Sequence, residues 1–247
     1  MERRTDGAET LIDSTDEIFK IPKRVTLTET IADTVARAIA TGILKPDERV
    51  TEVAMAERIG VSRAPIREAL KILHAQGIVT ADSGRGFRVA AFDDATIAKV
   101  LEVRLSLEAI LLRDAVQYWR ENDTAATELN VPIARMHEAA VNGDRAASLE
   151  ADLSFHQAIA EAAHNQIVAT LWSAIARHVM IIFSMRQYRA DDLFSVVRHH
   201  EMFRDFIREQ IRQESAPEAL RKELENHLLQ ISRMQPGHAA RGREQTG

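Results

Sequence analysis

Residues 60–70 read GVSRAPIREAL. Ser62 is a good N-cap for a helix that begins directly after it, and Pro65 then stands at the third helical position. A proline costs little there, because the first amides of a helix have no intrahelical partner. Arg63 and Arg67 are four residues apart and therefore project from one face. The stretch predicts a helix that presents cationic donors in its first turns, as a recognition helix does in the major groove of DNA.

The flanking segments decide between a DNA contact and an arginine pair that is merely solvated. A capping box at 26–29 begins a helix that ends at Gly42, and a short helix over 52–59 stops at Gly60. After the helix that carries the arginines, two β-compatible pieces, 78–80 and 87–89, surround the polar turn ADSGRG. Three helices followed by a hairpin form a winged helix-turn-helix, which favours the DNA contact.

The remainder of the chain is predicted to be long amphipathic helices. They are expected near 94–119, 124–141, 145–163, 166–187, 191–213 and 217–234. The fold class is therefore mainly α, with an N-terminal winged helix-turn-helix that carries a small β-hairpin wing and then an all-α antiparallel bundle of about six helices. The predicted divisions are a disordered arm at 1–20, a DNA-binding domain at 21–91, a helical domain at 92–234 and a flexible tail at 235–247.

Composition narrows the function classes. Residues 21–90 hold 11 Lys and Arg against 8 Asp and Glu, whereas residues 91–247 hold 18 against 23, so the positive charge lies with the predicted DNA-binding part. The absence of cysteine excludes disulfides and thiolate metal sites. The first twenty residues lack the continuous apolar core that a secretion signal needs, and no apolar run approaches the ~18 residues of a membrane span. We expect a soluble, cytoplasmic protein.

The segment from Leu27 to Val89 resembles the winged-helix domain of the GntR family of bacterial transcription regulators. The resemblance rests on AIATGILKPDERV, AERIGVSRAPIREALKILHAQGIV and the closing RGFRV. It implies a homodimer that binds a palindromic operator, with a wing at 83–88 in the minor groove. The DNA contacts expected from it are Ser62, Arg63, Pro65, Arg67 and, in the wing, Arg85, with Arg49 and Arg37 as phosphate contacts. Asp47 departs from the family, which usually has glycine in that turn, and Met55 stands where leucine is usual.

Histidines in the helical part form a candidate metal site. Asp152 and His156 have i, i+4 spacing and share one helix face, while His199, His200 and His227 lie on later predicted helices. A bundle can direct one ligand from each of several helices to one interior point. An Asp and three His suit zinc, nickel or manganese.

The same region resembles the all-helical FCD effector domain of one GntR subgroup. The resemblance rests on EVRLSLE at 102–108, ADLSFHQAIAEAAHN at 151–165, HEMFRDFI at 200–207 and HL at 227–228. It implies a divalent metal held by Asp152, His156, His200 and His227, and effector contacts from Arg104 and Asn165. The segment between His200 and His227 is about one helical turn longer than usual, which leaves His199 or Asp205 as alternative third ligands. An ion pair with Glu108 is the alternative role for Arg104.

These features predict a ligand-responsive regulator, and the resemblance favours a repressor released from DNA by a small organic acid. A metal-dependent hydrolytic or oxidative enzyme is the alternative, since an Asp/His site with open positions can activate water. A third interpretation is an architectural DNA-binding protein without an effector. No nucleophile and base arrangement is readable, and an enzyme would leave the winged helix unexplained, so we expect no catalysis.

Overall fold

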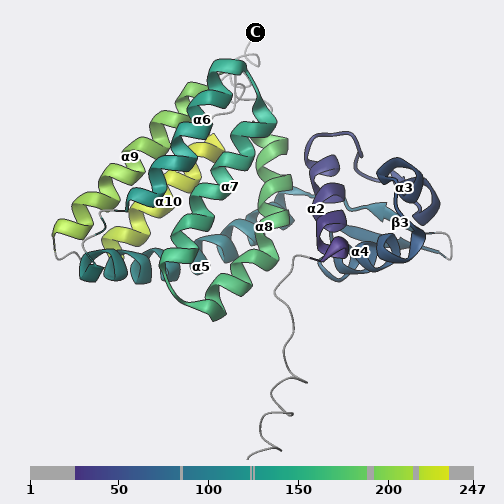
Figure 1. The fold of residues 1–247 in the computed structure, drawn as a ribbon, viewed down its shortest axis with the longest axis horizontal. Helices are drawn as coiled ribbons and strands as arrows, with labels where there is room; N and C mark the ends of the chain where they lie inside the picture. Colours follow the sequence, from purple (N-terminus) through teal and green to yellow (C-terminus); the bar gives the residue numbers. More distant parts are fainter. Residues whose placement is uncertain are drawn as a thin grey trace, which may run out of the picture.

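The fold is mainly α, as predicted, with two parts side by side in the computed structural model (Figure 1). The structure describes residues 26–83, 86–122, 124, 126–187, 192–213 and 217–233. The predicted arm at 1–20, the tail at 235–247 and Arg85 lie outside these residues. Among the described helices, none is both long and apolar enough to cross a membrane.

The first part is a winged helix-turn-helix. Its elements are α2 (Leu27–Ala40), β1 (Arg49–Val50), α3 (Glu52–Ile59), α4 (Arg63–Ala75), β2 (Val79–Asp82) and β3 (Gly86–Val89). The Thr26 hydroxyl accepts a hydrogen bond from the Glu29 amide at 3.2 Å, which confirms the predicted cap of α2. Gly60 ends α3 in the left-handed conformation with φ 78°. The structure thus confirms the predicted starts and stops of α3 and the start of α4.

The sheet has a third strand that the sequence did not predict. Its order is β1-β3-β2, with both pairings antiparallel. β1 has only two residues, too few to show the alternation of side chains that identifies a strand in a sequence. It is a strand because Val50 pairs with Phe87. Gly86 is required at this contact, since its φ is 115° and a Cβ would lie 2.9 Å from the Val50 carbonyl oxygen.

Asp47 stands in the turn before β1, where the family usually has glycine. Its φ is 64°, in the left-handed region that glycine adopts without strain and that Asp tolerates better than most side chains. The backbone of the turn therefore keeps the conformation that glycine would favour.

The second part is a helical bundle. Its elements are α5 (Asp94–Asn122), a 3-10 turn (Thr127–Leu129), α6 (Asn130–Asn142), α7 (Arg145–Ala162), α8 (Gln166–Gln187), α9 (Leu193–Arg212) and α10 (Pro217–Arg233). The prediction of one helix over 124–141 was wrong at its start. Ala126 has φ 50°, which interrupts the helix, and Pro132 stands at the third position of α6, where a proline is tolerated because the first amides of a helix have no intrahelical partner.

The two parts share a hydrophobic core. α8 faces α2 across their junction (Figure 1). Four consecutive buried residues of α8, Val179 to Ile182, belong to the same cluster as the core of the winged helix. A second cluster fills the bundle and includes Trp119, Phe155, Trp172 and Phe203. Because α8 contributes to both clusters, its position is tied to both parts.

Candidate metal centre and nucleic-acid interface

Three histidines from three helices meet inside the bundle. His156 of α7, His200 of α9 and His227 of α10 each offer a ring nitrogen, and these nitrogens lie within 4.8 Å of one another. All three side chains are buried. Phe155 meets the His200 ring edge-on, and Phe203 stacks on the His227 ring with centroids 4.4 Å apart, so aromatic packing fixes the rings.

Asp152 completes the donor set one turn before His156 on α7. It is fully buried, and its Oδ1 lies 3.1 Å from His200 Nε2. No described residue forms a hydrogen bond of good geometry with either carboxylate oxygen of Asp152 or with Nε2 of His156, His200 or His227. Buried polar atoms without partners are costly, and a bound ion is one explanation when they converge.

The tautomer of His200 is compatible with this explanation. Its Nδ1 lies 2.8 Å from the Val196 carbonyl oxygen, which can only accept, so Nδ1 carries a proton, and in the neutral ring Nε2 presents a lone pair. That nitrogen faces the Asp152 carboxylate at 3.1 Å, so either it carries a second proton that pairs with Asp152, or the neutral ring and the carboxylate share a bound cation. A backbone carbonyl behind a histidine is also the usual arrangement around a protein-bound metal.

Glu108 of α5 makes several contacts at this site, of which the sequence analysis predicted only the ion pair with Arg104. Its Oε1 accepts from Arg104 Nε at 2.6 Å and from Trp172 Nε1 at 2.9 Å, and its Oε2 lies 2.9 Å from His156 Nδ1. Burial alone raises the pKa of Glu108, but the charges of Arg104 and His156 and the hydrogen bonds lower it to about 2. Glu108 therefore stays anionic, and its position favours a proton on Nδ1 of His156 and a lone pair on Nε2.

Electrostatics keep the other ligands in their metal-binding forms. Burial raises the pKa of Asp152, but contact with His200 and the charges of His200, His156 and Arg104 lower it overall. Burial, followed by nearby positive charge, holds the pKa of His227 well below 6.5. An ionised carboxylate and a neutral imidazole are the states that bind a divalent metal.

One gap beside His156 is too small to hold a ligand. The gap bounded by Glu108, His156, Leu111 and Leu224 has no room for a water molecule. A small organic acid could reach this point only if the surrounding helices α5, α7 and α10 moved apart.

Other predicted residues are placed as follows. Of the alternative third ligands, Asp205 is 62% exposed and pairs with Arg204, and His199 is outside the three-histidine group. Asn165 accepts from the Val168 amide at 3.2 Å and donates to Asp114 at 2.8 Å, which gives it the role of capping α8.

The start of α4 is the candidate nucleic-acid interface. Ser62, Arg63 and Arg67 are exposed there, and the Ser62 hydroxyl makes no capping hydrogen bond although it stands at the N-cap. Pro65 occupies the third helical position, as predicted. Glu52 of α3, missed by the sequence analysis, accepts from Arg67 at 2.8 and 3.1 Å and from Arg63 at 3.3 Å.

The two predicted phosphate contacts differ in position. Arg49 lies on β1, with its Nε 3.7 Å from Asp82 Oδ2. Arg37 forms an ion pair with Glu150 of α7, so the structure places it at the junction of the two parts. We therefore leave Arg37 out of the proposed DNA contacts.

Comparisons with known proteins agree with both halves of the chain. Residues 27–89 match the family model described as "Bacterial regulatory proteins, gntR family", and residues 99–230 match the model of the FCD domain. Together these two matches cover most of the described residues.

Two relatives and a solved structure agree with these family matches. The chain is 30% identical over 170 residues to the "Probable D-xylose utilization operon transcriptional repressor" of Paenarthrobacter nicotinovorans, covering 69% of this chain and 74% of that protein. It is 30% identical over 169 residues to the "Glc operon transcriptional activator" of Escherichia coli (strain K12), covering 59% and 64%. The solved structure of E. coli McbR/YncC shares the fold, with a TM-score of 0.71 and 20% identity over 85% of this chain and 98% of that one.

Proposed function

The chain belongs to the GntR family of bacterial regulatory proteins and carries an FCD domain, and we propose that it is a repressor released from its operator by a small organic acid. The convergence of three buried histidines and a buried aspartate within the FCD domain carries this proposal. The family and the relatives are transcription regulators, so the metalloenzyme alternative is set aside.

The proposed metal ligands are Asp152, His156, His200 and His227. Zinc is our first choice, because nitrogen and carboxylate donors suit it, and nickel and manganese fit the same donors. When bound, the metal would supply a positive anchor for an effector carboxylate. The protein's own residues orient the ligands, through Val196 behind His200 and Glu108 behind His156.

Arg104 is the proposed second anchor for the effector carboxylate. Its guanidinium is fully buried and bound to Glu108, so an incoming carboxylate would compete with Glu108 for it. Such an exchange would also disturb the hydrogen bond from Trp172, which belongs to α8, the helix that faces the winged helix. The closed gap beside His156 supports a mechanism in which the effector opens the bundle.

The proposed assembly is a homodimer on a palindromic operator, in which each winged helix reads one half-site. An apolar stripe on α8 supports it: Ile167, Leu171 and Ala174 are exposed at i, i+4 and i+7, with Ile167 77% exposed. A contiguous apolar stripe of this kind is a candidate for contact with a second copy.

The direct test of DNA recognition is Arg67→Ala. Loss of a bidentate arginine should weaken binding to an operator selected in vitro by about 1 to 3 kcal/mol, while the oligomeric state stays unchanged. Arg198→Ala is the control, because Arg198 is an exposed arginine paired with Asp192 at the start of α9. Fluorescence anisotropy measures the affinity, and a wild-type footprint from Arg67→Ala would remove Arg67 from the contact set.

A further inference from the structure

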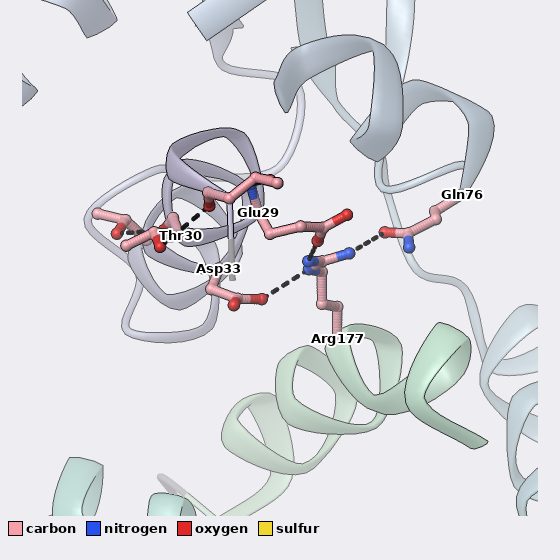
Figure 2. Close-up of polar contacts among 7 residues, drawn as sticks. Glu29, Thr30, Asp33, Gln76 and Arg177 are labelled. Atoms are coloured by element: carbon pink, nitrogen blue, oxygen red, sulfur yellow. Dashed lines mark hydrogen bonds and ion pairs between the residues drawn. The ribbon is translucent and has the colours of Figure 1, made fainter. Parts of the chain in front are cut away.

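Arg177 of α8 reaches across the junction into the winged helix (Figure 2). Its Nε donates to Asp33 Oδ1 at 2.8 Å, one terminal nitrogen donates to Gln76 Oε1 at 3.3 Å, and the other donates to the Glu29 carboxylate. The side chain is only 12% exposed. All three nitrogens of one guanidinium are therefore engaged by the DNA-binding domain.

The partners of Arg177 belong to two different helices of that domain. Glu29 and Asp33 lie one turn apart on α2, whereas Gln76 is the C-cap of α4, the proposed recognition helix. A guanidinium is planar and its donors point in fixed directions, so it constrains the angle between the helices that it joins. A lysine ammonium does not constrain that angle. One side chain of the FCD domain thus holds both α2 and the end of the recognition helix.

Two other kinds of contact at the junction constrain the angle between the two parts less than Arg177 does. The apolar residues from Val179 to Ile182 contribute burial, which is non-directional. Arg37 and Glu150 form a second ion pair across the junction, but both side chains are about half exposed, and exposed pairs are weak. Arg177 is a partly enclosed, directional contact, and its neighbour His178 adds a hydrogen bond with the Gln76 backbone; of these two residues, Arg177 also binds α2.

We propose that Arg177 is a positioning residue that fixes the angle of the recognition helix relative to the FCD domain, and so sets the half-site spacing the dimer accepts. The inference rests on the proposed binding of a dimer to a two-half-site operator. The two recognition helices of such a dimer must enter major grooves about 34 to 36 Å apart or multiples of this. A winged helix that is free to tilt would tolerate a wider range of spacings.

The test compares the full-length wild type, Arg177→Ala and the control Arg198→Ala on one DNA series. An operator is selected in vitro with the wild type, and duplexes are then made with its half-sites moved together or apart by one and two base pairs, together with a single half-site. For the wild type and the control, we expect the selected spacing to be favoured about tenfold, because other spacings require the DNA to bend or twist. For Arg177→Ala, we expect this preference to fall to about twofold, with affinity for the single half-site unchanged because the recognition helix is intact.

The outcomes separate three cases. A spacing profile of Arg177→Ala equal to that of the wild type would overturn the positioning role, and so would an equal loss of affinity on the single half-site by a variant that is folded. If Arg177→Ala does not fold, Arg177→Lys keeps the charge without the fork and is expected to show the same broadening. A wild type that selects only single half-sites would instead overturn the proposed dimeric operator binding, and the spacing role with it.

Discussion

Glu52 binds both of the α4 arginines that we propose as DNA contacts. Its carboxylate binds both Arg63 and Arg67, and its hydrogen bond with Arg67 is the main reason that its pKa is lowered. The carboxylate holds the Arg67 side chain in one orientation and partly compensates its positive charge. A fixed orientation of the Arg67 side chain favours a specific hydrogen bond to a base edge, whereas its positive charge favours binding to any phosphate, whatever the sequence.

Glu52→Gln should therefore separate specificity from affinity. Removal of the carboxylate leaves one more uncompensated positive charge beside the DNA, so binding to a scrambled duplex should strengthen and its salt slope should steepen by about 1. The ratio of operator to scrambled affinity should fall. Titrations of both duplexes at several salt concentrations measure the affinity ratio and the salt slope. Glu57→Gln is the matched control, an exposed glutamate on the same helix; an unchanged ratio for Glu52→Gln would show that Glu52 does not orient the arginines.

Only part of the proposed metal site could be predicted from the spacing of residues in the sequence. Asp152 and His156 could be paired from their spacing, because the helix period places them on one face. Their meeting with His200 and His227 came from the family resemblance, since helices far apart in sequence carry them. The predicted alternative, an ion pair between Arg104 and Glu108, is confirmed, but the contacts of Glu108 with His156 and Trp172, 48 and 64 residues away, could not be predicted.

α8 connects the proposed metal site to the DNA-binding domain. Trp172, near its start, binds Glu108 beside His156, and Arg177 binds α2 and the end of α4 (Figure 2). The two residues are five positions apart on one continuous helix. A shift of α8 at Glu108 would therefore reach α4, which is the route by which we propose that the two sites are coupled.

Trp172→Phe tests the hydrogen bond at the start of this connection. The substitution keeps an aromatic ring but removes the N–H that binds a buried carboxylate, so the free energy of unfolding should fall. Trp119→Phe is the control, because Trp119 is also fully buried and its N–H has no partner among the described residues. Urea unfolding should give Trp172→Phe a loss larger by about 1.5 to 3 kcal/mol, the usual value of a hydrogen bond to a charged group. Equal losses would mean that the bond to Glu108 contributes nothing.

Elements with strong local signals were predictable and those without were not. The capping threonine of α2 and the glycine after α3 fixed helix ends that the structure confirms. β1 had no such signal, because it is a strand only through its pairing with β3. The predicted start of α6 was too early because Ala126 adopts a left-handed conformation that alanine rarely takes, and Pro132, which lies in the first turn of the observed helix, was not used as a signal.

The arrangement of the two domains depends on contacts that no local pattern encodes. Arg177 and Asp33 are 144 residues apart, and neither helical periodicity nor capping relates them. The shared hydrophobic cluster likewise joins α8 to residues of α2 and α4. The sequence predicted both domains as separate units, but their junction was visible only in the structure.

The central claim is that a DNA-binding regulator of this family holds a metal inside its FCD domain. Native mass spectrometry of the full chain, purified without chelator, tests it most directly, with His156→Ala as the variant and His137→Ala, outside the three-histidine group, as the control. We predict a dimer with one metal per subunit for the wild type and the control, and a metal-free dimer for His156→Ala. A wild-type dimer without metal, or one whose metal content survives His156→Ala, would contradict the claim.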